Sequence, residues 1–203
     1  MTIVIIVITT IVSIISFQND RLFSILLLNP LKFLRKKEYY RIFSHGFIHA
    51  DWTHLIVNMF VLFSFGRAIE GYFNQLKEMD YLQYPQLHYL TLYIGGIVVS
   101  SIPSIIKHRN DYWYNSVGAS GGVSAVVFTS IFFGPLNILY LYFIPIPGIV
   151  FGALYLIYSQ YMSKRNKDNI NHDAHFAGSV FGFLYPLFIN IGLFKVFLNQ
   201  LGF

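Results

Sequence analysis

Cysteine is absent from this chain of 203 residues, so it can form no disulfide and can use no thiolate as a nucleophile. Charge is scarce as well, because charged residues make up 11% of the sequence whereas soluble domains average about 25%. Hydrophobic residues account for 55% of the chain. These proportions argue against a water-soluble globule, and we expect a single membrane domain over residues 1–203.

The N-terminal apolar stretch, Ile3 to Ile15, lacks two features of a secretory signal. No Lys or Arg precedes it, and no small-residue cleavage site follows it. We therefore expect a retained first membrane span, although a short one, since a span needs roughly 20 residues. The formal net charge of +5 fits contact with anionic lipid headgroups better than contact with nucleic acid.

Apolar segments separated by polar or Pro/Gly-marked joints predict six membrane-spanning helices and an all-α bundle. Their expected ranges are 1–17, 52–72, 87–106, 116–134, 147–162 and 174–191. The first connection, Gln18 to Asp51, is long and amphipathic, which is typical of a segment embedded in the membrane interface.

Polar residues gather at the starts of the second, fourth and sixth segments, which alternating topology places on one side of the membrane. They are His45, His49, His54, Asn58, Ser120, His172, Asp173 and His175. Ionisable groups within a membrane are costly and usually face a cavity that serves function. Helix N-termini also favour negative charge that develops nearby. The pattern predicts a polar site in one leaflet.

Small residues flank Ser120, and such residues commonly mark close helix packing. Gly178 and Gly182 likewise predict that the sixth segment approaches a neighbour closely. Packing and catalysis are compatible here, because contact at Gly178 would bring His175, one turn earlier, near a serine on the fourth segment. A neutral imidazole could then take the serine proton. Asp173 lies on nearly the opposite side of the helix, so we expect a Ser-His dyad without a third member.

His54 and Asn58 are four residues apart and share a helix face. They could donate hydrogen bonds to one oxygen, or they could bond neighbouring helices instead, and the spacing leaves both alternatives open.

A metal site is the competing chemical interpretation, because His45 and His49 are four apart and His172 and His175 are three apart. The chain has no H-E-x-x-H motif, and no carboxylate lies among the histidines of the second segment. A metal would also leave Ser120 unexplained. We expect no metal and no other cofactor.

Together these motifs resemble the rhomboid family of intramembrane serine proteases. The similarity covers nearly the whole chain, with six spans, a long first loop and three motifs in the right order. The matching residues are Arg41, Phe43, His45, His49, His54, Asn58, Glu70, Gly118 to Gly121, Ala174, His175, Gly178 and Gly182. The ordered set is far more specific than any one motif.

The resemblance implies a role for each matching residue. Ser120 would be the nucleophile and His175 the general base. His54 and Asn58, with the backbone N–H of Ser120, would form the oxyanion hole. The supporting residues would be His49, Arg41, Gly118, Gly178 and Gly182.

The implied activity is that of a serine endopeptidase that cleaves transmembrane segments of membrane proteins. Its partners would be those substrates and the lipid bilayer. The protein would be an integral multi-pass protein of a bacterial inner membrane. The alternative is a non-catalytic relative that binds transmembrane helices, although such relatives lose the serine or histidine that this chain retains. A small transporter fits less well, because no inverted repeat is visible.

Two positions depart from the family pattern. Tyr40 stands where a Trp is usual before the loop-one Arg. Ser124 stands one turn after the nucleophile, where some members place an aromatic residue that stacks on the histidine. The sequence therefore leaves open what holds the ring of His175.

The basic residues conflict with the orientation that the resemblance implies. The first, third and fifth joints hold Arg21, Lys32, Arg35, Lys36, Lys37, Arg41, Lys107, Arg109, Lys164, Arg165 and Lys167. The other side holds only Arg67, Lys77 and Lys195. The positive-inside rule would place the N-terminus outside. The family usually keeps it in the cytosol, with the site opening outward, and we follow the resemblance because charges in a surface-lying loop count less.

Overall fold

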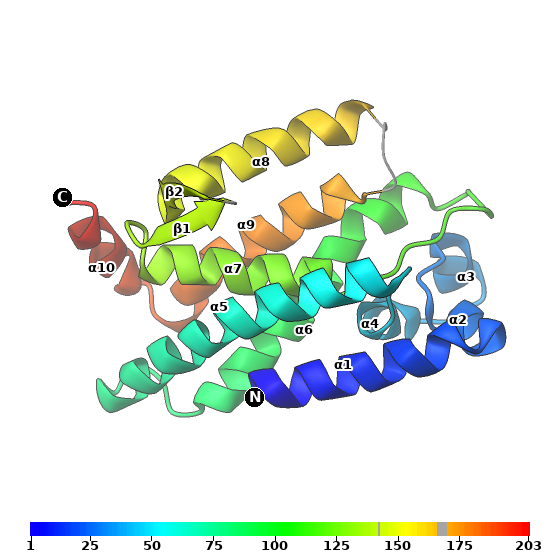
Figure 1. The fold of residues 1–203 in the computed structure, drawn as a ribbon, viewed down its shortest axis with the longest axis horizontal. Coiled ribbons are helices and arrows are strands. Elements are labelled where there is room, and N and C mark those ends of the chain that lie inside the picture. Colours follow the sequence, from blue (N-terminus) through cyan, green and yellow to red (C-terminus); the bar gives the residue numbers. More distant parts are fainter. Residues whose placement is uncertain (142, 166–169) are drawn as a thin grey trace.

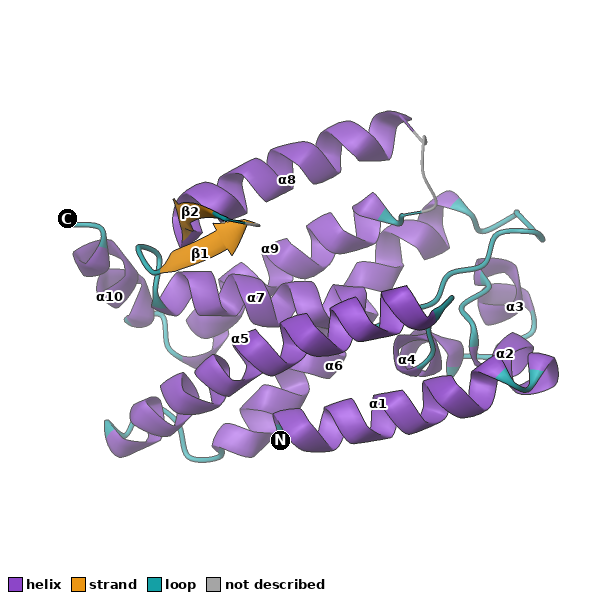
Figure 2. Cartoon of the chain, viewed as in Figure 1, coloured by secondary structure: helices purple, strands orange, loops and turns teal. Residues whose placement is uncertain are grey.

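The structure is a computed structural model that describes residues 1–141, 143–165 and 170–203. The described chain is mostly helical and includes one two-stranded hairpin (Figure 2). Lys167, which belongs to the basic set above, lies outside the described residues.

Each of the six apolar segments contains a helix. These helices are α1 (Thr2–Phe17), α5 (Trp52–Glu78), α6 (Pro85–Lys107), α7 (Ser120–Phe133), α8 (Gly148–Arg165) and α9 (His172–Ile189). In Figure 1, α5, α7 and α9 run against the direction of α1, α6 and α8. The first residues of α5, α7 and α9 therefore lie at one end of the bundle.

The first connection folds into short helices at that same end (Figure 1). They are α2 (Asp20–Leu26), α3 (Pro30–Arg35), α4 (Arg41–Ser44) and the 3₁₀ turn η1 (His45–Phe47). Asn19 and Asn29 begin α2 and α3, since their side chains accept the backbone N–H groups of Leu22 and Lys32. An antiparallel bridge then joins Leu28 to Ser116, which ties this connection to the segment before α7.

Two elements at the opposite end were not expected. Strands β1 (Ile138–Leu141) and β2 (Ile144–Pro147) form an antiparallel hairpin after α7, and α10 (Leu193–Gln200) follows α9. The all-α expectation is therefore wrong at this hairpin. In the sequence, Pro145 and Pro147 indicate only a break before the fifth helix. A two-stranded hairpin tolerates both prolines because each of its strands is an edge strand.

Helix α7 lies in the middle of the bundle, and residues 121–133 are all buried. Glycines let its neighbours reach its backbone. A Cβ atom at Gly178 would lie 2.4 Å from the carbonyl oxygen of Gly121, and one at Gly182 would lie 2.1 Å from that of Ala125. On the other flank, a Cβ atom at Gly96 of α6 would lie 2.9 Å from Cα of Gly122. Close packing of small residues is the usual way in which helices associate in a membrane.

Within the described residues, α5 and α6 are long and apolar enough to cross a membrane, judged by length and composition. Helices α9 and α10 would together make a third candidate, although the chain bends by 119° between them. Helices α1 and α7 are apolar but shorter. The six-span arrangement therefore stays a prediction.

Candidate active site

Ser120 is the first residue of α7 and is half-buried. The chain reaches it through Gly118, whose φ of +117° is a conformation that favours glycine. A Cβ atom at Gly118 would lie 2.6 Å from Cε1 of His54. The imidazole of His54 therefore packs directly against the backbone two residues before Ser120.

His54 reaches this position from the first turn of α5, where Asp51 caps the helix by accepting the His54 N–H at 2.8 Å. The side chain of Asn58 donates to the carbonyl oxygen of His54 at 2.8 Å. One N–H of this carboxamide thus bonds its own helix and leaves one for another acceptor. The joint donation by His54 and Asn58 to one oxygen stays a prediction.

His49 is fully buried and lies at the centre of a chain of hydrogen bonds. Its Nε2 accepts the N–H of Ala119 at 3.4 Å, and its Nδ1 lies 2.9 Å from the hydroxyl of Ser13. That hydroxyl in turn donates to the carbonyl of Phe47 at 3.0 Å. The order of donors requires a neutral ring protonated at Nδ1. Burial and the nearby His54 lower the pKa of His49 to about 3, which favours that form.

Arg41 and His45 hold the first connection. The buried guanidinium of Arg41 donates to the carbonyls of Leu27 at 2.6 Å and Ser24 at 2.9 Å. His45 Nε2 lies 2.7 Å from Ser101 Oγ on α6, and burial lowers the pKa of this histidine to about 4. The carbonyl of His45 also accepts the N–H of Gly118 at 2.9 Å. The two side chains therefore hold the first connection, and the backbone of His45 joins it to the turn that leads to Ser120.

His175 lies on the first turn of α9. Asn171 caps this helix by accepting the N–H of Ala174 at 3.1 Å. Asp173 pairs with Lys107 Nζ at 3.1 Å and accepts a hydrogen bond from Ser163. The carboxylate of Asp173 therefore faces the ends of α6 and α8.

The hydroxyl of Tyr155 on α8 lies 3.1 Å from Nδ1 of His175. Sequence reasoning missed this residue, because no spacing rule links a tyrosine on the fifth helix to a histidine on the sixth. The serine at position 124 was the one available signal, since it left open which side chain holds the histidine ring.

Helices α7 and α9 bring Ser120 and His175 to the same end of the bundle. Gly121, the residue after Ser120, touches Gly178, which lies one turn beyond His175. The dyad therefore stays a prediction that rests on the packing of these two helices.

The part of the chain that the structure describes contains no group of three or more His, Asp or Glu side chains that could hold a metal ion.

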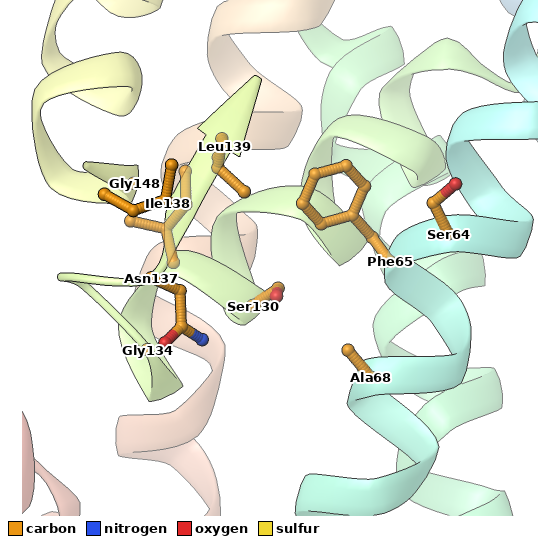
Figure 3. Close-up of a pocket in the computed structure, with 10 residues that line it drawn as sticks. Ser64, Phe65, Ala68, Ser130, Gly134, Asn137, Ile138, Leu139 and Gly148 are labelled. Atoms are coloured by element: carbon orange, nitrogen blue, oxygen red, sulfur yellow. The ribbon is translucent and has the colours of Figure 1, made fainter. Parts of the chain in front are cut away.

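A pocket of about 310 Å³ lies away from the candidate site, between α5, the end of α7 and the hairpin. Figure 3 shows Phe65 of α5 pointing into it. Ser130, which lines this pocket, is ten residues after Ser120, or roughly 15 Å along the helix. This pocket is therefore separate from the candidate site.

Glycine-packed apolar helices with buried polar groups at one end define an integral membrane protein of the helical-bundle class. The sequence profile of the Rhomboid domain matches residues 36–191, which is most of the chain. The chain therefore belongs to the rhomboid family, as the ordered motifs predicted.

Two relatives agree with this assignment. The mitochondrial RHOMBOID-like protein 12 of Arabidopsis thaliana is 28% identical over 152 residues, which cover 67% of this chain and 42% of the relative. YdcA of Bacillus subtilis (strain 168), named as a candidate rhomboid protease, is 27% identical over 154 residues, which cover 72% of this chain and 65% of the relative. The chain thus spans less than two thirds of the length of either relative.

Proposed function

We propose that this chain is a six-span intramembrane serine endopeptidase that cleaves transmembrane segments of other membrane proteins. The supporting observation is the backbone contact of α7 and α9 at Gly121 and Gly178, beside Ser120 and His175. Family membership adds to it, because the family includes proteins named as proteases.

In the proposed reaction, Ser120 Oγ attacks the scissile carbonyl carbon while Nε2 of His175 takes the hydroxyl proton. The carbonyl π electrons move to the oxygen, which the backbone N–H of Ser120, the ring of His54 and the side chain of Asn58 would stabilise. The tetrahedral intermediate collapses, and His175 gives its proton to the leaving amine. Water, activated by the same imidazole, then hydrolyses the acyl ester and frees Ser120.

A transmembrane substrate must unwind locally before it can react, because a helix keeps its carbonyl groups in backbone hydrogen bonds. The candidate site lies at the end of the bundle where α5, α7 and α9 begin (Figure 1). We therefore expect cleavage near the end of a substrate's transmembrane segment rather than at its middle.

The test uses purified protein in liposomes with a reporter transmembrane substrate. Ser120→Ala and His175→Ala should each abolish cleavage, and a fluorophosphonate probe should label the wild type and not Ser120→Ala. Ser64→Ala is the matched control, since Ser64 is exposed on α5 and bonds the carbonyl of Phe60. Cleavage retained by Ser120→Ala would contradict the mechanism. A folded wild type that neither cleaves nor labels would favour a helix-binding relative without catalysis.

A further inference from the structure

Tyr155 is in contact with the proposed general base and comes from a helix that bears neither dyad residue. Its hydroxyl lies 3.1 Å from Nδ1 of His175. The two rings are nearly parallel, at 16°, and their centroids are 6.5 Å apart. At that separation the hydroxyl, rather than the ring face, makes the close contact with the imidazole.

The ring of Tyr155 is held in place by aromatic neighbours on two helices. Phe151, one turn earlier on α8, stacks with it at 6.0 Å between centroids. Phe128 of α7 packs against it at 5.8 Å and 50°. Aromatic pairs at such distances add stabilisation beyond the area they bury, so the tyrosine ring is fixed between α7 and α8.

The direction of the Tyr155–His175 hydrogen bond follows from the chemistry of a general base. A neutral imidazole carries one hydrogen, and the nitrogen that accepts the serine proton must be free of it. If Nε2 faces Ser120, Nδ1 bears the hydrogen and donates it to the oxygen of Tyr155. The opposite arrangement, with Tyr155 donating to Nδ1, would place the hydrogen on Nε2 and block proton transfer from the serine.

Ser124 lies near the hydroxyl of Tyr155. It is buried on α7, one turn after Ser120. A tyrosine oxygen that accepts from His175 can direct its own hydrogen to the serine hydroxyl. The small side chain at position 124 also leaves room for an aromatic ring that arrives from α8.

We infer that Tyr155 is the positioning residue that holds His175 in the tautomer with hydrogen on Nδ1. This inference rests on the proposed function, because it assigns a role within that reaction. No proton leaves Tyr155 during catalysis; its oxygen accepts one hydrogen bond throughout, which strengthens as His175 becomes an imidazolium.

The test compares Tyr155→Phe with Tyr161→Phe in the liposome cleavage assay. Phenylalanine keeps the ring contacts with Phe128 and Phe151 and removes only the hydroxyl. Tyr155→Phe should lower kcat roughly 10-fold with KM unchanged, since one hydrogen bond that acts on the reacting group is lost. Tyr161 lies two turns away on the same helix, where it contacts Arg165, so Tyr161→Phe should match the wild type. An unchanged kcat in Tyr155→Phe would overturn the inference.

A second measurement is independent of cleavage. Nitrogen-15 NMR of the wild type labelled at histidine should show the His175 resonances of the form protonated at Nδ1, and Tyr155→Phe should shift them toward the other tautomer. His175→Gln identifies the resonances. Identical spectra for the wild type and Tyr155→Phe would contradict the inference even in a catalytically silent protein. If the shift appears while Ser120 proves dispensable for cleavage, the proposed function fails and the tyrosine contact stands.

Discussion

Two buried histidines before α5 make the stability of this protein depend on pH. His45 has a pKa of about 4 and His49 a pKa of about 3, both lowered from 6.5 chiefly by burial. The unfolded chain therefore takes up these protons at a higher pH than the folded chain. The contribution of each neutral ring is complete above about pH 6.5 and is lost progressively as the pH falls toward the folded values.

We therefore expect the free energy of unfolding to fall between pH 6.5 and 4, by on the order of 1 kcal/mol per pH unit for each histidine. Thermal unfolding in detergent across this range measures the slope. His49→Gln should lower stability at pH 7 and flatten the slope. His108→Gln is the control, because His108 lies in the loop after α6 and pairs with Asp111. A wild type equally stable at pH 7 and pH 4.5 would disprove this account.

At the level of elements, the contact between α7 and α9 depends on two positions without a side chain. A Cβ atom at Gly178 or Gly182 would lie within 2.4 Å of a carbonyl oxygen of α7, so the two backbones would have to separate. Gly178→Ala and Gly182→Ala should each destabilise the fold by about 1–3 kcal/mol. Both should also reduce cleavage by more than their loss of folded protein explains, since they move His175 away from Ser120.

Gly71→Ala is the matched control for these glycines. Gly71 lies on α5 and a Cβ atom there meets nothing within 4 Å. Alanine forms helix more readily than glycine, so this variant should be as stable as the wild type or slightly more stable. Thermal unfolding and cleavage, measured side by side for the three variants, test whether the α7–α9 contact is tight. Equal behaviour of all three would show that the α7–α9 contact is not tight.

The same elements show how far the sequence could be interpreted. The apolar segments and the pair Gly178 and Gly182 carry strong local patterns, so helices and a close contact could be predicted from them. The hairpin could not, because its two prolines indicate a break without saying what the broken chain pairs with. Tyr155 could not either, because its contact with His175 depends on how α8 packs beside α9. A contact between two single side chains on different helices has no repeating spacing that would reveal it in the sequence.

At the scale of the whole molecule, the positive-inside rule gives a clear orientation only if the basic residues of the first connection are included in the count. Exposed basic residues of that connection are Arg21, Arg35, Lys36 and Lys37, whereas Arg41 is buried. Among the described residues, the other basic residues at the end that carries the candidate site are Lys107, Arg109, Lys164 and Arg165. Those at the opposite end are Arg67, Lys77 and Lys195. Without the first connection the two ends are nearly balanced.

The first connection does not behave as a free loop. Its short helices pack at the end of the bundle, where Arg41 and the Leu28–Ser116 bridge fix them. Its exposed cations can then bind anionic headgroups on whichever side the membrane places them. We therefore expect the orientation that the family usually adopts, with the candidate site facing outward and the N-terminus in the cytosol.

The lack of native cysteine makes this orientation directly measurable. Asn110→Cys adds one thiol at the site end, in the exposed loop after α6, and Lys77→Cys adds one near the opposite end of α5. In intact cells, a membrane-impermeant maleimide should label the cysteine at position 110 and should reach the one at position 77 only after permeabilisation. The reverse pattern would show that the positive charges of the first connection set the topology, and that Ser120 and His175 lie on the cytosolic side.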